Sequence, residues 1–210
     1  MTKATTPTQP SDDPAAEGRA HHLCPPWIGY LLMSPIRRLY EDPAAVLGPH
    51  VRSGMTILDV GCAMGYFSLP LARMVGPSGR VVCVDIQERM LKTLRKRARR
   101  RGLEAIIEPR ASTPTSLTLD DLAGAVDFAL AFHVAHETSH PDLFFVQCFA
   151  ALRPGARFLV SEPVSCVSDE AWEETKGQAR ATGFTVVEET STKKSWTMLL
   201  EKPSESVPAS

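Results

Sequence analysis

Residues able to bind a ligand gather first in a short turn near residue 60. An apolar stretch ends at Asp59, and the next six residues read Val-Gly-Cys-Ala-Met-Gly. Gly61 and Gly65 allow a tight turn and a close backbone approach to a ligand, because neither has a Cβ. An acid directly before the first glycine would repel a pyrophosphate but attract an ammonium group. The turn therefore predicts a site for a ligand with a cationic end.

A second acid follows at a suitable distance along the chain. Twenty-six residues after Asp59, another apolar stretch ends in Val84-Asp85-Ile86. A carboxylate at the end of the second strand of such a unit suits the two hydroxyls of a ribose. Together the two acids imply a ligand that carries both a ribose and a cationic amino-acid end.

His133, His136 and Glu137 are candidate catalytic residues, because they follow a later apolar stretch. An imidazole or a carboxylate can take the proton of an acceptor that must lose one early in the reaction. The His-x-x-His-Glu spacing is not that of a zinc protease, so we expect no metal site. The alternative interpretation is that these side chains cap or orient the next loop and helix.

These residues need a scaffold that brings several strand ends together. From residue 54, short apolar stretches alternate with longer amphipathic ones, which predicts an α/β, doubly wound, Rossmann-like domain with its ligand beyond the carboxyl ends of the strands. The last two strands are close in sequence and should be antiparallel neighbours. The predicted strands are Thr56–Val60, Arg80–Asp85, Glu104–Glu108, Val126–Phe132, Arg157–Glu162, Thr185–Glu189 and Ser195–Glu201. The predicted helices are Tyr66–Val75, Gln87–Arg101, Leu119–Ala123, Pro141–Leu152 and Asp169–Thr182.

Composition limits the class of protein. The 210 residues suit one domain, and 43% hydrophobic with 22% charged residues excludes a mostly disordered, collagen-like or coiled-coil chain. The longest near-continuous apolar run, Leu143–Leu152, has ten residues, whereas a membrane span needs about 20. Residues 1–20 have no apolar core of a signal peptide. Five scattered cysteines with no CxxC pair favour a reducing compartment, so we expect a cytoplasmic protein.

The chain divides into four segments by its pattern. Residues 1–20 and 203–210 are expected to be disordered tails, and 54–202 to form the core. Residues 21–53 are punctuated by proline and predict a helical lid over the site. Within it, Cys24, Trp27 and Tyr30 are candidate substrate contacts; alternatively, the aromatic residues only dock the segment on the sheet.

With these motifs the chain resembles the class I S-adenosylmethionine-dependent methyltransferases. The Asp59–Gly65 turn matches the D-x-G-x-G-x-G loop of that family, with Ala63 in place of the middle glycine. Asp85 matches the ribose-binding acid, and Phe128–Glu137 is similar to the fourth strand and its loop. Leu-Arg-Pro-Gly at 152–155, followed by Phe-Leu-Val-Ser-Glu-Pro at 158–163, matches the approach to the fifth strand, with Ala156 replacing a second glycine.

The resemblance covers residues 45–202 and implies a seven-stranded sheet in the order 3-2-1-4-5-7-6, with strand 7 antiparallel. It implies S-adenosyl-L-methionine as cofactor, with Asp59 near its amino group, Asp85 on its ribose and Ile86 over its adenine. Ser112 or a backbone group stands in for an acid that many relatives have near the adenine. The cofactor-binding residues so implied are Asp59, Gly61, Ala63, Gly65, Asp85, Ile86, Ser112 and Phe132.

The predicted helix after Asp85 concentrates positive charge. Residues 89–101 hold eight Lys or Arg and no acid, which leaves 15 basic against 24 acidic residues elsewhere. The helix has no interleaved aromatic residue on which bases could stack, so a solvated helix face is favoured over a nucleic-acid site.

We therefore expect a methyltransferase that acts by in-line displacement on a small hydrophobic or aromatic acceptor, as a monomer or homodimer. An RNA methyltransferase that uses the basic helix, and a cofactor-binding domain without catalysis, are the alternatives.

Overall fold

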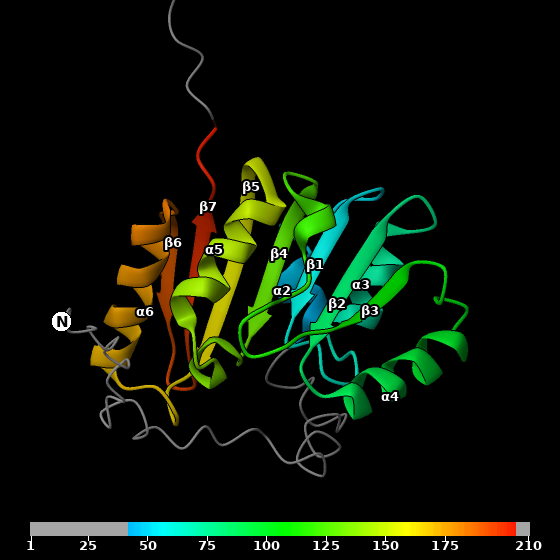
Figure 1. Ribbon diagram of the computed structural model, residues 1–210, viewed down its shortest axis with the longest axis horizontal. Helices are drawn as coiled ribbons and strands as arrows, with labels where there is room; N and C mark the ends of the chain where they lie inside the picture. Colours follow the sequence, from blue (N-terminus) through cyan, green and yellow to red (C-terminus); the bar gives the residue numbers. More distant parts are fainter. Residues whose placement is uncertain (1–41, 205–210) are drawn as a thin grey trace, which may run out of the picture.

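The computed structural model of the protein describes residues 42–204, which form a single twisted sheet with helices on both faces (Figure 1). The strand order is β3-β2-β1-β4-β5-β7-β6. Strands β1 to β5 run parallel, whereas β7 is antiparallel to both β5 and β6. The predicted sheet order and the antiparallel seventh strand are confirmed. The strands are β1 Thr56–Val60, β2 Arg80–Asp85, β3 Ile107–Ala111, β4 Val126–Phe132, β5 Leu152–Pro163, β6 Thr185–Ser191 and β7 Ser195–Glu201.

The helices follow the strands in alternation. In Figure 1, α5 and α6 lie in front of the sheet, with α2 and α3 behind it. Ser168 caps the N-terminus of helix α6, where its hydroxyl accepts the Ala171 N–H at 3.3 Å, and Gly183 caps the C-terminus in a left-handed conformation. The α-helices are α2 Pro43–Leu47, α3 Ser68–Val75, α4 Glu88–Arg99, α5 Pro141–Ala151 and α6 Asp169–Thr182, and the 3-10 helices are η3 Asp120–Leu122 and η4 Ala135–Glu137.

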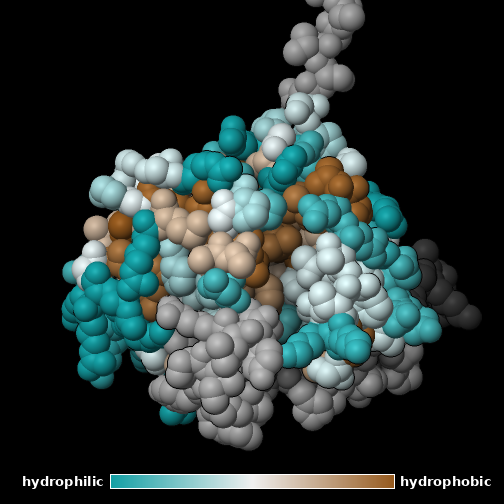
Figure 2. All heavy atoms as spheres, turned by 180° about the vertical axis from the view of Figure 1, so that it is seen from behind, coloured by the Kyte–Doolittle hydropathy of each residue, from teal (hydrophilic) through white to brown (hydrophobic). Residues whose placement is uncertain are grey.

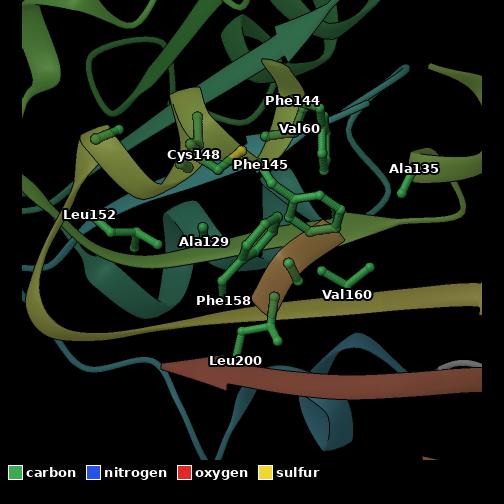
Figure 3. Close-up of a cluster of buried hydrophobic side chains, with 14 of the residues drawn as sticks. Val60, Ala129, Ala135, Phe144, Phe145, Cys148, Leu152, Phe158, Val160 and Leu200 are labelled. Atoms are coloured by element: carbon green, nitrogen blue, oxygen red, sulfur yellow. The ribbon is translucent and has the colours of Figure 1, made fainter. Parts of the chain in front are cut away.

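Each face of the sheet has its own hydrophobic core. Alternate residues of the parallel strands point to opposite faces, so β1 contributes Leu58 to the core under α5 and α6 and Ile57 to the core under α3 and α4. Figure 3 shows the first core, where Phe145 of α5 meets Phe158 of β5. These two cores hold the strand ends in fixed positions relative to one another.

Two predicted strands start at the wrong residue. The third strand lies at Ile107–Ala111 rather than Glu104–Glu108, because the chain turns at Leu103, whose carbonyl accepts the N–H of both Ile106 and Ile107. Strand β5 starts at Leu152, where we expected the end of a helix. Leu152 pairs with Val126 and the next pair is Arg157 with Phe128, so the intervening residues form an irregular bulge inside the strand.

The described part of the predicted lid, residues 42–53, belongs to the core. Leu47 is fully buried and Val51 nearly so, and both pack with residues of α3 and β1. Residues 21–41, with Cys24, Trp27 and Tyr30, lie outside the described residues, as do both predicted tails apart from 203 and 204. A lid formed by residues 21–41 therefore stays a prediction.

Over residues 42–204, no helix combines the length and the apolar character needed to cross a membrane. The four cysteines in the same range are free thiols, three of them buried and Cys166 exposed.

Replacing Phe145 with alanine should destabilise the fold. The side chain is fully buried and its ring packs edge-on against those of Phe144, Phe158 and Phe184. The cavity left behind should lower the free energy of unfolding by about 3–5 kcal/mol, measured by chemical denaturation. The matched control is Val146→Ala, one residue further and half exposed, which should change it by less than about 0.5 kcal/mol. An equal change in the free energy of unfolding in the two variants would contradict the tight packing of Phe145 in the core.

Candidate active site

A cavity of about 510 Å³ opens at the carboxyl ends of β1, β2, β4 and β5. Parallel strands that end at one edge of a sheet bring their following loops together there. Gly65 is the one described candidate residue that is not part of the cavity lining. The candidate residues that line it are Asp59, Gly61, Ala63, Asp85, Ile86, Ser112, Phe132, His133, His136 and Glu137.

The turn after β1 is held open by unusual backbone conformations. Gly61 has φ +71° and Ala63 has φ +45°, in a backbone region that residues other than glycine rarely adopt. The N–H groups of Gly61 and Cys62 both donate to the Val84 carbonyl at the end of β2, at 2.8 and 3.0 Å. A Cβ on Gly61 would lie 2.5 Å from the Val134 side chain, so the glycine is needed for close packing as well as for the turn.

Asp85 fixes this turn from the end of the neighbouring strand. Its Oδ2 accepts the Ala63 N–H and its Oδ1 accepts the Gln87 N–H, both at 2.8 Å. Burial raises the pKa of this carboxyl, although the two backbone donors oppose the change. Each oxygen has a second lone pair that can accept a hydroxyl from a ligand in the cavity.

Asp59 is a buried acid with a hydroxyl partner. Its carboxylate accepts the Ser68 hydroxyl at 2.5 Å, and the residue is 3% exposed. Burial raises its pKa to about 7, and the nearby charge of Asp85 acts in the same direction. Among the described residues no cation is paired with either acid, so a cationic group in the cavity would favour the ionised form of Asp59.

Phe132 and His133 bring an aromatic wall to the end of β4. The ring centroid of Phe132 lies 4.5 Å from that of Phe67 and 4.5 Å from that of His133. His133 has φ +61°, and its N–H donates to the Ser161 carbonyl at 2.7 Å, which continues the pairing with β5. After this turn the chain enters η4, whose His136 and Glu137 line the cavity.

Glu162 is a site residue to which the sequence assigned no role. It lies near the end of β5, is 1% exposed, and accepts the N–H groups of Val134 and Ala135 through Oε1 at 3.2 and 2.8 Å. Its Oε2 is in hydrogen-bond contact with Nδ1 of His136. The sequence signal for it was an acid at the end of an apolar strand, the same signal that marked Asp85.

The loop after β3 forms one side of the cavity, and Ser112 is the one residue of it that the sequence singled out. Residues 112–117 line it, and α5 holds this loop through Gln147. The Gln147 side chain accepts the Leu117 N–H at 2.7 Å and donates to the Thr115 carbonyl at 3.1 Å. Ser112 is thus part of a polar loop of fixed shape.

Helix α4 contributes one of its cations to the site. Arg97 donates to the Met64 carbonyl, in the turn after β1, and burial lowers the pKa of its guanidinium to about 10. The predicted solvated face holds for most of the helix, including Lys92, Lys96 and Arg100, which are exposed. At the lower left of Figure 2, where the half-turn brings α4, hydrophilic side chains gather.

Groups of three or more His, Cys, Asp or Glu that could hold a metal ion are absent from residues 42–204.

Comparison with known proteins decides the family. Residues 51–203, the whole region of the sheet, match the family described as "Methyltransferase domain". The chain belongs to this methyltransferase-domain family. It is 33% identical over 141 residues to a ubiquinone biosynthesis O-methyltransferase of Caulobacter vibrioides, which is 67% of this chain and 52% of that protein. It is 32% identical over 126 residues to the ubiquinone/menaquinone biosynthesis C-methyltransferase UbiE of Pseudomonas entomophila, 59% of this chain and 48% of that one.

The chain thus spans about half the length of these two curated relatives. The fold is also similar to that of a solved structure, a SAM-dependent methyltransferase from Aquifex aeolicus, with a TM-score of 0.75 and 25% sequence identity. This match covers 85% of this chain and 98% of that one. The methyltransferase domain described here is of class I, and its cofactor is S-adenosyl-L-methionine.

The described residues of this methyltransferase domain fit that cofactor. The cavity is within the range of about 300–1,000 Å³ typical of small-molecule sites. Its two buried acids, Asp59 and Asp85, lie on either side of a turn whose backbone is open to a ligand. A sulfonium compound with an amino-acid end and a ribose supplies the cation and the hydroxyls that these acids lack.

Replacing Arg97 with methionine should loosen the turn after β1. Methionine keeps the apolar stem but leaves the Met64 carbonyl without its charged donor. Because hydrogen bonds to charged groups contribute about 1.5–3 kcal/mol and this guanidinium is only half-buried, we expect a loss of about 1–2 kcal/mol in unfolding free energy. Hydrogen exchange at residues 61–65 should also accelerate. The control is Arg100→Met, at the exposed residue that follows α4. Equal hydrogen-exchange protection of residues 61–65 in both variants would contradict this role of Arg97.

Proposed function

We propose that the protein transfers a methyl group from S-adenosyl-L-methionine to a small hydrophobic or aromatic acceptor bound in the cavity. The observation that carries this proposal is that a single cavity has two different groups of side chains at its two ends. The two buried acids and the open turn lie at the carboxyl ends of β1 and β2, and His136 and Glu137 lie after β4. A donor held at the first end would present its methyl group toward an acceptor at the second.

The residues after β1 and β2 have the chemistry to orient the donor. We assign the amino group to Asp59, the ribose hydroxyls to Asp85, and the adenine to Ile86 with the loop at Ser112. Ile86 is 40% exposed in the cavity lining, so an apolar ring system can cover it. S-adenosyl-L-methionine supplies an activated methyl group. The main task of these residues is therefore alignment, which can contribute up to about 7–11 kcal/mol in favourable systems.

The acceptor end favours a small apolar molecule. Tyr66, Leu143 and Phe144 line the cavity together with Phe132, and Leu143 is 37% exposed there. The two curated relatives are named for the biosynthesis of quinones, which supports an acceptor of this kind. Cys24, Trp27 and Tyr30 remain predicted acceptor contacts. The cytoplasm and a monomeric or homodimeric state remain predictions as well.

The proposal is tested by isothermal titration with S-adenosylhomocysteine, followed by incubation with S-adenosylmethionine and a panel of small phenols, amines and thiols. Binding with turnover on one member of the panel supports it. Absence of S-adenosylhomocysteine binding would contradict the cofactor assignment, and binding without turnover on any acceptor would favour the non-catalytic alternative.

The Asp85→Ala variant should bind S-adenosylhomocysteine much more weakly than the wild type. It loses two charge-assisted hydrogen bonds to the ribose and the acceptor for the Ala63 N–H. Each such bond contributes about 1.5–3 kcal/mol, so affinity should fall by at least about tenfold in the calorimeter. Asp120→Ala removes an exposed acid at η3 and should bind as the wild type does. Unchanged binding in Asp85→Ala would refute the ribose assignment.

Affinity for S-adenosylhomocysteine should rise with pH in a range set by Asp59. Its pKa is about 7 because burial disfavours the carboxylate, and a bound ammonium group favours it. Binding therefore releases a proton, and affinity should increase as pH rises from about 5.5 to 7.5, by at most about tenfold per unit. The Asp59→Asn variant has no proton to release and should lose this slope. A slope retained in that variant would assign the proton to another group.

A further inference from the structure

The contacts of Glu162 point beyond a structural role. A buried carboxylate near a strand end can be explained by the backbone that it accepts, and Oε1 satisfies both Val134 and Ala135. That leaves Oε2, which contacts Nδ1 of His136. His136 in turn lines the cavity, and its side chain is 25% exposed. The chain therefore places a fully buried acid behind an imidazole that faces the acceptor end.

The carboxylate determines which nitrogen of His136 carries the proton. An ionised Glu162 can only accept hydrogen bonds, so a neutral imidazole beside it has its hydrogen on Nδ1 and its lone pair on Nε2. Among the described residues, Nε2 of His136 has no hydrogen-bond partner. The nitrogen able to take a proton is thus available to a bound molecule.

We propose that His136 is the general base of this site, that Glu162 positions it, and that the acceptor is therefore a hydroxyl group on an apolar or aromatic molecule. This inference rests on the proposed function. A neutral amine can attack with its own lone pair, and a thiol ionises near neutral pH, whereas a hydroxyl needs a base as it attacks. Leu143 and Phe144 supply apolar surface for the rest of the acceptor.

The step balances without any further reactant. The acceptor O–H bond breaks and its proton moves to Nε2 of His136. The oxygen forms a bond to the methyl carbon while the carbon–sulfur bond breaks, and that electron pair stays on sulfur. The products are the methyl ether, the neutral thioether and a proton on His136, which passes to solvent. Nδ1 keeps its hydrogen toward Glu162 throughout, so the carboxylate stabilises the imidazolium.

Charges around His136 act together on its protonation. Burial lowers its pKa, but the hydrogen bond to Glu162 and the charges of Glu162 and Glu137 raise it above the usual value. Glu137, on the same 3-10 helix, has a raised pKa from burial, to which Asp85 of β2 adds. The other titratable side chains that line this cavity are Asp59, Cys62, Tyr66, His133, His140 and Cys166.

The first experiment detects proton transfer from a bound hydroxyl to the protein in the absence of methyl transfer. The protein saturated with S-adenosylhomocysteine is titrated with 4-nitrophenol at a pH below the pKa of the free phenol, and the visible spectrum reports the ionised fraction. The wild type should bind it as phenolate. Glu162→Gln keeps an oxygen for the Val134 and Ala135 N–H groups but presents an amide donor to Nδ1, which moves the hydrogen of His136 to Nε2. That variant should bind the neutral phenol.

The second experiment measures methyl transfer to catechol, as formation of S-adenosylhomocysteine against pH. Activity should rise with pH around the raised pKa of His136, since the base is lost on protonation. Glu162→Gln and His136→Gln should each lower kcat by about 10²- to 10⁴-fold, with cofactor-product binding unchanged. His136→Gln leaves Glu162 and its backbone contacts in place, so it separates loss of the base from loss of the fold. Glu104→Gln, at an exposed position before β3, is the matched control.

The outcomes separate this inference from the proposed function. Failure of the wild type to bind S-adenosylhomocysteine overturns the function itself. If the wild type binds S-adenosylhomocysteine but does not bind 4-nitrophenol, or binds it in its neutral form, the inference of a hydroxyl acceptor is overturned and the proposed function is not. Equal catechol kinetics and equal pH profiles in the wild type and both variants overturn the role of His136 and Glu162.

Discussion

The site depends above all on the carboxylate of Asp85. One of its oxygens holds the Ala63 N–H of the turn after β1 and the other holds the Gln87 N–H at the start of α4. A single side chain at a strand end thus fixes two neighbouring loops, while the Val84 carbonyl takes the N–H groups of Gly61 and Cys62. Without these contacts the positive φ of Ala63 would have little to sustain it.

The parallel sheet explains why three buried acids share one edge. Asp59, Asp85 and Glu162 lie in or at the ends of β1, β2 and β5, and burying a carboxylate is costly unless it is hydrogen-bonded. Each one accepts a backbone N–H or a hydroxyl. Asp59 has the least compensation, with a pKa near 7, and Glu162 has a histidine. The same edge therefore places two acids at one end of the cavity and a histidine in contact with a buried acid at the other.

Local sequence patterns were sufficient for most of the fold and for the side chains that meet at the cavity from the ends of β1, β2 and β4. Strands β1, β2, β4 and β7 were predicted at their observed bounds, because each contains a short and mainly apolar run. Strand β3 was misplaced, since it is an edge strand whose residues are only partly buried and include Pro109. Arg97 was grouped with a solvated face, because sequence spacing cannot show that one cation of a basic helix reaches the turn after β1.

The sequence by itself determined the family resemblance, because the motifs that carry it lie within a few residues of strand ends, and the resemblance implied the sheet order. It also singled out Asp59 and Asp85, two acids that the structure places on one cavity. Only the tertiary structure decided which groups work together across the chain. Glu162 and His136 are 26 residues apart, and Arg97 and Met64 are 33 apart. Such pairs form because packing of the sheet and its helices brings distant strand ends together, and no local pattern encodes that distance.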